Sequence, residues 1–147
     1  MKNWWKHAAA AGIAVAILGA GMTTTTASAD VLKDRSAAMK SISKANKALQ
    51  KAAKGGMAAD AQKQAKIIVA VAEKMESLFP KGSGAGYGEK TRAKADIWTD
   101  WAKFQKANAA MKTAAMKVAA GDMSAAPEIG KTCGGCHKPF RGPKIKK

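Results

Sequence analysis

The sequence predicts an all-α protein that folds as an antiparallel four-helix bundle, and three observations support this prediction. Apolar residues recur at spacings of three and four in four separate segments, which is the period of a helix. Stretches in which apolar and polar residues alternate, as they do in a half-buried strand, are absent. Glycine and proline separate the segments, and four helices with short connections mostly pack as an antiparallel bundle.

The first 29 residues have the composition of an export signal and are left out of the fold. Two lysines precede an apolar run at residues 8–20, which is shorter than the about 20 residues that a membrane-spanning helix needs. The sequence ASA at residues 27–29 has the form of a cleavage site. We therefore expect residues 1–29 to be a cleaved signal peptide and residues 30–147 to form one domain.

The chain after this leader is strongly basic. The leader holds two lysines and no acidic residue, so the exported chain keeps all but two units of the formal charge of +16. This excess favours rapid association with acidic partner proteins. No second apolar run long enough to cross a membrane follows, so we expect a soluble periplasmic protein without a stable membrane span.

The first two helices are expected before and after a pair of glycines. The first covers residues 30–54, with Asp30 as its N-cap. The second covers residues 57–79 and ends before Pro80, which cannot continue a helix. The predicted seam of the first helix consists of Val31, Arg35, Met39, Ile42, Asn46 and Leu49.

The other two helices follow the longest predicted loop. Residues 81–90 contain four glycines and a serine and cannot easily hold a helix. The third helix is expected over residues 95–120, before Gly121, and the fourth begins near Ser124 and continues through Cys136. The seams are rich in alanine, so an additional apolar body inside the bundle would help close its core.

The only two cysteines of the chain stand three residues apart, and a histidine follows the second. On a helix, Cys133, Cys136 and His137 occupy positions i, i+3 and i+4, so all three project from one face. This is the spacing of c-type haem attachment, in which two sulfurs form thioether bonds and the imidazole binds the iron. A covalently held cofactor also suits an exported chain, because it is not lost by dissociation. The motif therefore predicts one haem c.

Three alternatives compete with haem attachment at this motif. A redox disulfide of this spacing normally follows a strand in a βαβ unit, and no such unit is predicted. A zinc site usually has four ligands, but the chain after the leader has no third cysteine and no second histidine. A structural disulfide would close too small a loop to stabilise the fold much. Haem attachment is therefore favoured over all three.

The motif and several shorter segments resemble class II c-type cytochromes, which comprise cytochrome c′ and its low-spin relatives. IGKTCGGCHKPFR at residues 129–141 resembles the last helix of that family, and LFP at residues 78–80 resembles the end of its second helix. ADIW at residues 95–98 resembles the start of its third helix, and DRSAAMK at residues 34–40 resembles its first. The resemblance implies a four-helix bundle with haem attached near the C-terminus.

The resemblance also implies roles for individual residues around the haem. Arg35 is expected near a propionate, Met39 over the iron as a distal ligand, and Arg141 beside His137, the proximal ligand. The resemblance further places two aromatic residues against the porphyrin, Trp98 and Phe104.

Each of these roles has an alternative that the residues leave open. A methionine on a helix seam ordinarily fills the core, so Met39 can pack without binding iron. Arg35 can be a solvated charge, and Trp98 and Phe104 can pack in the core away from the haem. His137 is the only histidine after the leader, so the protein candidates for a distal ligand are thioethers, with lysine behind them: Met39, Met57, Met75, Met111, Met116 and Met123.

Two functions are possible, depending on whether Met39 binds the iron on the haem face opposite His137. If Met39 binds iron opposite His137, the six-coordinate haem serves as a one-electron carrier for acidic redox partners. If Met39 only crowds that face, the iron is five-coordinate and binds nitric oxide or carbon monoxide, as a scavenger or a sensor. Neither function is that of an enzyme.

A haem-free basic module is the remaining class of function. Such a module would bind nucleic acid or membranes through its lysines. Export argues against nucleic acid, and membranes are disfavoured because the lysines of the first helix are spread along what should be its solvated face. Members of the resembled family commonly form homodimers through the first two helices. The same lysines would repel a second copy unless they point away, so the sequence leaves the oligomeric state open: Lys33, Lys40, Lys44, Lys47, Lys51 and Lys54.

Overall fold

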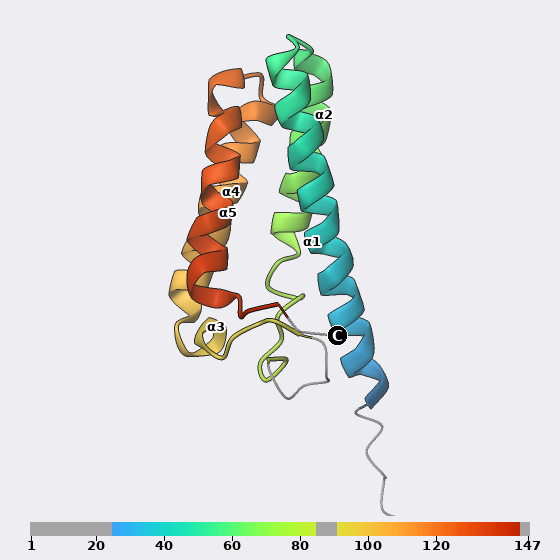
Figure 1. Cartoon of the computed structure of the whole chain (residues 1–147), viewed down its shortest axis with the longest axis vertical. Coiled ribbons are helices and arrows are strands. Elements are labelled where there is room, and N and C mark those ends of the chain that lie inside the picture. Colours follow the sequence, from blue (N-terminus) through green and yellow to red (C-terminus); the bar gives the residue numbers. More distant parts are fainter. Residues whose placement is uncertain (1–24, 85–90, 145–147) are drawn as a thin grey trace, which may run out of the picture.

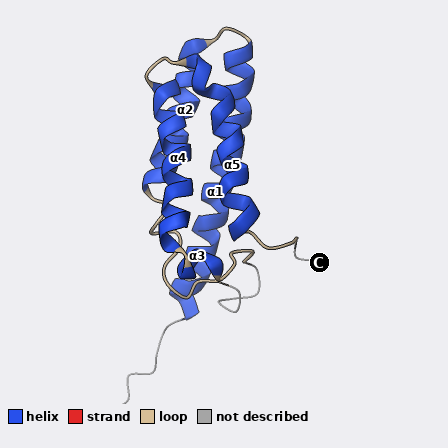
Figure 2. Ribbon diagram, turned by 90° about the vertical axis from the view of Figure 1, so that its left-hand side faces the viewer, coloured by secondary structure: helices blue, strands red, loops and turns tan. Residues whose placement is uncertain are grey.

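The computed structural model describes residues 25–84 and 91–144. Most of the predicted signal peptide, the second half of the predicted 81–90 loop and residues 145–147 lie outside the described residues. The described part is helical and contains no β-strand, which confirms the all-α prediction (Figures 1 and 2). Its elements are α1 (Thr25–Lys54), α2 (Ala58–Glu73), α3 (Asp96–Thr99), α4 (Trp101–Ala119), the 3-10 turn η1 (Met123–Ala125) and α5 (Ala126–Phe140).

The four long helices form the predicted bundle from two antiparallel pairs (Figure 1). Helix α1 packs along α2, α2 packs along α4, and α4 packs along α5. Contact between α1 and α5, which would complete the ring, is much sparser. None of the described helices is both long enough and apolar enough to span a membrane.

Both helix pairs turn at the same end of the bundle, which we call the closed end (residues 55–57 and 120–122). A glycine with positive φ stands in each turn, Gly56 at 71° and Gly121 at 107°. The residue after each glycine donates its backbone N–H to a carbonyl five residues back, Met57 to Ala52 at 2.9 Å and Asp122 to Lys117 at 3.0 Å. The glycine therefore ends each helix because it adopts the left-handed conformation that this cap requires.

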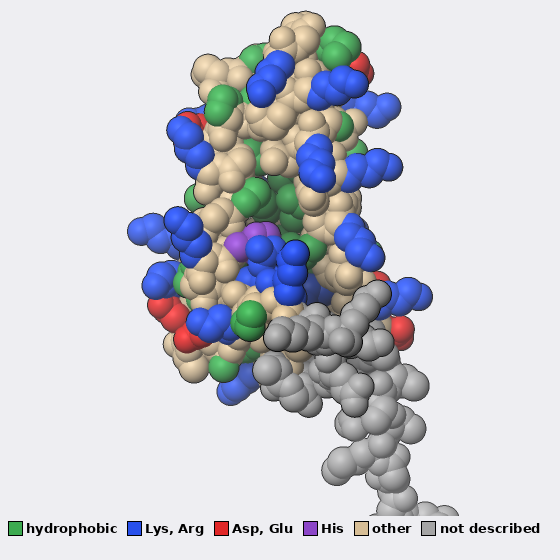
Figure 3. Space-filling model, in the orientation of Figure 1, with side chains coloured by type: hydrophobic (Ala, Val, Ile, Leu, Met, Phe, Trp, Pro, Cys, Tyr) green, Lys and Arg blue, Asp and Glu red, His purple; other side chains and the backbone are tan. Residues whose placement is uncertain are grey.

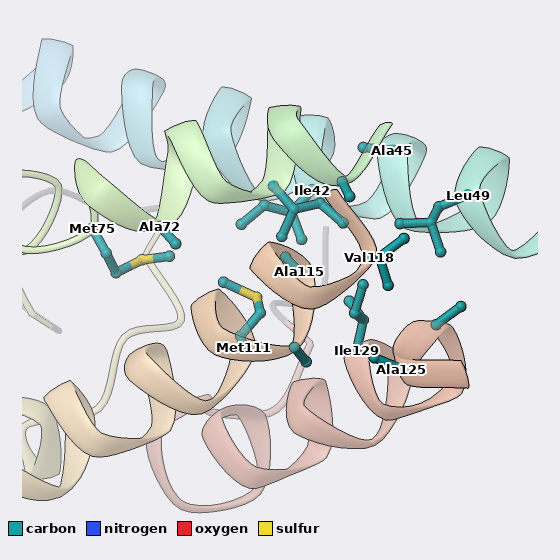
Figure 4. Packing of buried hydrophobic residues seen from close by; sticks show 14 of the residues in the cluster. Ile42, Ala45, Leu49, Ala72, Met75, Met111, Ala115, Val118, Ala125 and Ile129 are labelled. Atoms are coloured by element: carbon teal, nitrogen blue, oxygen red, sulfur yellow. The ribbon is translucent and has the colours of Figure 1, made fainter. Parts of the chain in front are cut away.

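Small and medium-sized aliphatic side chains pack the closed half of the bundle. Leu49 of α1, Val118 of α4 and Ile129 of α5 are fully buried, and Figure 4 shows them converging with alanines from neighbouring helices. Alanine lets the helices approach closely, so this half is filled without large side chains. The buried alanines of the core include Ala45, Ala52, Ala61, Ala65, Ala72, Ala114, Ala115, Ala125 and Ala126.

The predicted end of the second helix at Phe79 was wrong by about one and a half turns. Helix α2 ends at Glu73, and consecutive turns follow as far as Phe79. Lys74 N donates to Val71 O at 3.1 Å and Phe79 N donates to Glu76 O at 3.0 Å, so most backbone hydrogen bonds here span three residues instead of the four of an α-helix. The apolar period continues through these turns, which is why the sequence alone did not reveal the change.

The predicted third helix is interrupted near its start. Asp100, with φ −128° and ψ 59°, separates the short α3 from α4, and its carboxylate accepts a hydrogen bond from Lys103 N at 3.2 Å. Asp100 is therefore the N-cap of α4. The start of the fourth helix near Ser124 is confirmed, because η1 leads directly into α5. Helix α1 begins at Thr25 rather than at the expected N-cap, Asp30.

Candidate haem site

A cavity of about 600 Å³ opens between α1 and α5 in the half of the bundle away from the closed end. We call this half the open end, and the cavity the α1/α5 cavity. Figure 3 shows the hollow, with hydrophobic side chains inside it and a histidine and basic side chains along its edge. Its volume lies within the roughly 300–1,000 Å³ typical of small-molecule and cofactor sites. The apolar part of its wall includes Leu32, Ile42, Met75, Phe79, Ile97, Phe104, Ala107, Met111 and Phe140.

The three residues of the attachment motif line the α5 wall of this cavity. Cys133, Cys136 and His137 are each half-buried, and both cysteines are free thiols. The Cys133 thiol donates to Ile129 O at 3.4 Å, one turn back on the same helix. Two thiols and an imidazole on one helix face, opening into a largely apolar cavity, match the groups that hold a covalent haem.

Local sequence determines how α5 presents this face. Glycines fill the two positions between the cysteines, and a Cβ added at Gly135 would meet no atom within 4 Å. Pro139 lies inside the last turn, and α5 ends at Phe140 because the backbone becomes extended at Arg141, with φ −112° and ψ 122°. Arg141 N closes the last turn by donating to His137 O at 3.2 Å. His137 thus lies within the final turn of α5 and lines the same cavity as two guanidinium groups, those of Arg92 and Arg141.

The surroundings shift the pKa values of two groups of the motif. Burial raises the pKa of the Cys136 thiol, and the neighbouring Cys133 adds to this effect. Burial lowers the pKa of His137 below its ordinary value of 6.5, and the positive charges of Arg141 and Arg92 lower it further. The imidazole is therefore neutral at pH 7, which is the form that binds a metal.

Arg35 lies in the same cavity wall but directs its donors to the segment between α2 and α3. It is 6% exposed, so the alternative that it is a solvated charge is wrong. Its Nε donates to Leu78 O at 2.8 Å, and its Nη1 donates to Ser83 O and Thr91 Oγ1, both at 3.0 Å. Nη2 donates to Ser83 Oγ, and the guanidinium lies 4.2 Å from the ring centroid of Phe79. Through these hydrogen bonds, Arg35 links α1 to residues near both ends of the predicted 81–90 loop.

The structure brings most of the other predicted residues to the same cavity. Met39 of α1 is half-buried and lines the wall that α1 contributes. Phe104 is 2% exposed, and its ring centroid lies 4.9 Å from that of Phe79 and 5.6 Å from that of Phe140. Arg141, which is exposed, follows the end of α5 at the cavity edge. The cavity therefore brings together residues that lie far apart in the sequence.

Trp98 is the predicted haem neighbour that does not line the cavity. Its Nε1 donates to Phe79 O at 3.1 Å. A Cβ added at Gly84 would lie 2.6 Å from its ring, so the ring packs directly against the backbone there. This position corresponds to the core-packing alternative that the sequence left open for Trp98.

Arg92 and Asn108 line the cavity and make long-range hydrogen bonds, but neither was among the predicted site residues. The half-buried Arg92 donates to the carbonyls of Gly142 and Pro143, about 50 residues further along the chain. Asn108 donates from Nδ2 to Ala72 O at 2.9 Å, and its Oδ1 is buried without a partner among the described residues. Asn108 stood on the predicted seam of the third helix, whereas no local pattern marks Arg92, because its partners are distant in sequence.

The comparisons with known proteins all point to one family. The family model described as "Cytochrome C'" matches residues 30–141. A cytochrome c′ of Pararhodospirillum photometricum is 37% identical over 117 residues, which are 73% of this chain and 92% of that protein. A cytochrome c′ of Rhodopseudomonas palustris is 34% identical over 137 residues, which are 87% of this chain and 91% of that protein.

Solved structures agree with this similarity. A cytochrome c′ from a Rhodobacter species has a TM-score of 0.68 and 28% identity, covering 80% of this chain and 98% of the other. A mutant cytochrome c′ of Alcaligenes xylosoxidans, solved as its nitric oxide complex, has a TM-score of 0.67 at 21% identity and covers 80% of this chain and 97% of its own; it shows likeness of fold alone. Since the family model spans nearly all of the chain after the predicted leader, this chain belongs to the cytochrome c′ family and binds haem c.

Proposed function

We propose that this cytochrome binds a small gaseous ligand, such as nitric oxide or carbon monoxide, at the haem face opposite His137. The observation that supports the proposal is the arrangement of the α1/α5 cavity. Cys133, Cys136 and His137 line one wall from α5, and Met39 lines another from α1. The relatives named above are cytochromes c′, and a protein of the same fold was solved with nitric oxide bound.

Each residue of the motif has a distinct task in this proposal. The sulfurs of Cys133 and Cys136 hold the haem covalently, so the protein keeps it after export. The neutral His137 imidazole binds the iron from the α5 side. The haem supplies the iron that takes the gas, and the apolar cavity wall favours a small neutral ligand over charged solutes. No enzymatic turnover is proposed.

The remaining site residues shape this pocket. Arg35 holds Leu78, Ser83 and Thr91 against α1. Its place near a haem propionate is proposed from the family resemblance. Phe104 supports one wall through its contacts with Phe79 and Phe140. Arg141 lies beside His137 and keeps that side of the haem positively charged.

An electron carrier is the second candidate, and the position of Met39 favours it. Met39 lies four residues after Arg35, one turn along α1, and its half-buried thioether lines the cavity. A thioether that reaches the iron would give six-coordinate haem without an open gas site. The protein would then pass single electrons to acidic redox partners, in keeping with the strong positive charge that remains after the leader is removed.

Location and assembly belong to the same proposal. We place the protein in the periplasm, with residues 1–29 removed as a signal peptide and residues 30–147 forming the haem domain. A homodimer remains an open proposal. All six lysines of α1 that were expected on its solvated face are exposed, so they would have to point away from any copy packed on α1: Lys33, Lys40, Lys44, Lys47, Lys51 and Lys54.

Optical spectra of the oxidised and reduced protein separate the two candidates. Met39→Leu removes the sulfur at nearly constant volume, and Met111→Leu is the matched control, because Met111 lines the same cavity. A gas-binding site predicts broad high-spin bands that neither substitution changes and that shift when carbon monoxide is added. An electron carrier predicts a weak far-red band and sharp reduced bands that only Met39→Leu abolishes. Absence of haem absorbance from cells that mature c-type cytochromes would contradict both.

A further inference from the structure

The chain that follows the haem-attachment helix is fastened to the segment that precedes α3. Ala93 and Arg141 form an isolated antiparallel bridge. Lys94 N donates to Phe140 O at 3.0 Å, and Gly142 N donates to Arg92 O at 2.7 Å. The two segments therefore hold each other at the open end, directly after the last turn of α5.

The side chain of Arg92 strengthens this attachment. Its Nε donates to Gly142 O at 2.9 Å and to Pro143 O at 2.8 Å, and its Nη2 donates to Gly142 O at 2.7 Å. A planar guanidinium presents several donors in a fixed fork, so it can engage two successive carbonyls at once. In the sequence, Arg141 stands between His137 and the two residues that accept hydrogen bonds from Arg92, Gly142 and Pro143. Arg92 therefore restricts the position of Arg141.

Arg92 also brings a positive charge to the cavity. Arg92 and Arg141 both line the cavity, and the positive charge of each lowers the pKa of His137. No acidic side chain lines the α1/α5 cavity among the described residues. Asp96, four residues after Arg92, pairs with Lys94 at 2.7 Å. In the part of the chain that the structure describes, no salt bridge neutralises Arg92 or Arg141.

We propose that Arg92 is a positioning residue that raises the reduction potential of the haem iron, through its own charge and by fixing the segment that carries Arg141. The proposal rests on the proposed role of His137 as the iron ligand. Reduction adds one electron to ferric iron and makes the site more negative by one charge. A fixed positive charge within a partly buried cavity therefore favours the ferrous form, and the potential rises.

The test compares the reduction potential of the haem-loaded protein with that of three variants at pH 7. Arg92→Gln removes the charge and most of the fork, so its potential should fall below that of the wild type. Arg92→Lys keeps the charge but not the fork, so its potential should lie between the two. Lys94→Gln is the matched control: Lys94 is exposed, does not line the cavity and donates to Pro139 O at 3.0 Å, so its loss should leave the potential nearly unchanged.

Hydrogen–deuterium exchange of residues 138–144 supplies a readout that does not depend on the potential. Both Arg92 variants should exchange faster there than the wild type, because the fork no longer holds Gly142 and Pro143. A wild-type potential in fully loaded Arg92→Gln would overturn the proposal, and so would unchanged exchange in Arg92→Lys. If the Arg92→Gln protein cannot be produced, the comparison of Arg92→Lys with the wild type decides the proposal. Failure of the proposed role of His137 is distinguishable, because His137→Ala would leave the haem spectrum unchanged if His137 did not bind the iron.

Discussion

The closed and open ends of the bundle are built from different side chains. At the closed end, Leu49, Val118 and Ile129 pack with many alanines, and all three are fully buried. At the open end, an aromatic cluster stands on one side of the cavity: the ring centroids of Phe79, Trp101 and Phe140 lie 4.9, 5.2 and 5.6 Å from that of Phe104. The largest side chains thus stand where the helices do not close on each other.

This difference shows which part of the core the protein supplies by itself. Alanine-rich helices fill the closed end at close approach, so that end needs no other group. The aromatic cluster at the open end covers one side of the α1/α5 cavity, whose other walls come from α1 and α5. We therefore expect haem to complete the packing of the open end and to leave the closed end unaffected.

The largest effect is expected from removing the two thiols at the open end. The double substitution Cys133→Ala and Cys136→Ala leaves no sulfur for a thioether bond, so covalent haem should be lost completely. Haem staining of a denaturing gel measures this directly. Each single variant, which keeps one sulfur, serves as the graded control. Covalent haem retained in the double variant would show that the motif is not the attachment site.

Truncation of one large residue in each half tests the independence of the two ends. Phe104→Ala should cost about 3–5 kcal/mol of unfolding free energy and also shift the haem absorbance, because Phe104 lines the cavity. Leu49→Ala should cost about 2–5 kcal/mol and leave the absorbance unchanged. Denaturant unfolding and optical spectra measure the two effects. A spectral shift in Leu49→Ala as large as that in Phe104→Ala would abolish the distinction between the ends.

A smaller effect is expected where the segment after α2 crosses the Trp98 ring. Gly84→Ala places a Cβ 2.6 Å from that ring, so the segment must move. Overpacking of this kind costs about 1–3 kcal/mol. Thermal unfolding should show the loss, and Gly130→Ala is the control, because a Cβ added at Gly130 meets nothing within 4 Å. Equal melting temperatures for Gly84→Ala and the wild type would contradict the close packing described here.

The smallest effect is expected at the turn before α5 at the closed end. Asp122 accepts a hydrogen bond from Ser124 N at 3.1 Å, and its bonds to Ser124 lower the pKa of the carboxyl below 3.8. The unfolded chain therefore takes up this proton at a higher pH than the folded chain does. Asp122→Ala should slightly lower the melting temperature at pH 7, and the difference should vanish as the pH falls through the lowered pKa. A difference independent of pH would show that the carboxylate charge is not involved.

Helix period and breakers predicted most of the fold, and the errors fall where local geometry changes without a change in pattern. Gly56 and Gly121 mark the two turns of the closed end, as glycines in a left-handed conformation. The apolar seam runs through residues 74–79 and past Asp100, although α2 ends at Glu73 and α4 begins at Trp101. Asp100 was a detectable signal, because aspartate is a favoured N-cap, but the continuous seam around it concealed the break.

The candidate site was predictable where its residues share one helix and not where they meet across the chain. The spacing of Cys133, Cys136 and His137 places them together on any helix. The family resemblance placed Met39 and Arg35 in the same pocket. It did not supply the partners of Arg35 in residues 78–91, or the bonds from Arg92 to Gly142 and Pro143, because these contacts join residues 43 to 56 positions apart.

The sparse contact between α1 and α5 has a consequence for how the molecule assembles. Each antiparallel pair joins neighbours in sequence, so α1 with α2, and α4 with α5, can form early through local contacts. Docking the two hairpins closes a much longer loop and is the slower step. The proposed thioether bonds would join haem to the second hairpin alone, whereas the cavity is also lined by α1 of the first. Covalent attachment can therefore precede docking, and the attached haem would then act as a nucleus on which the first hairpin folds.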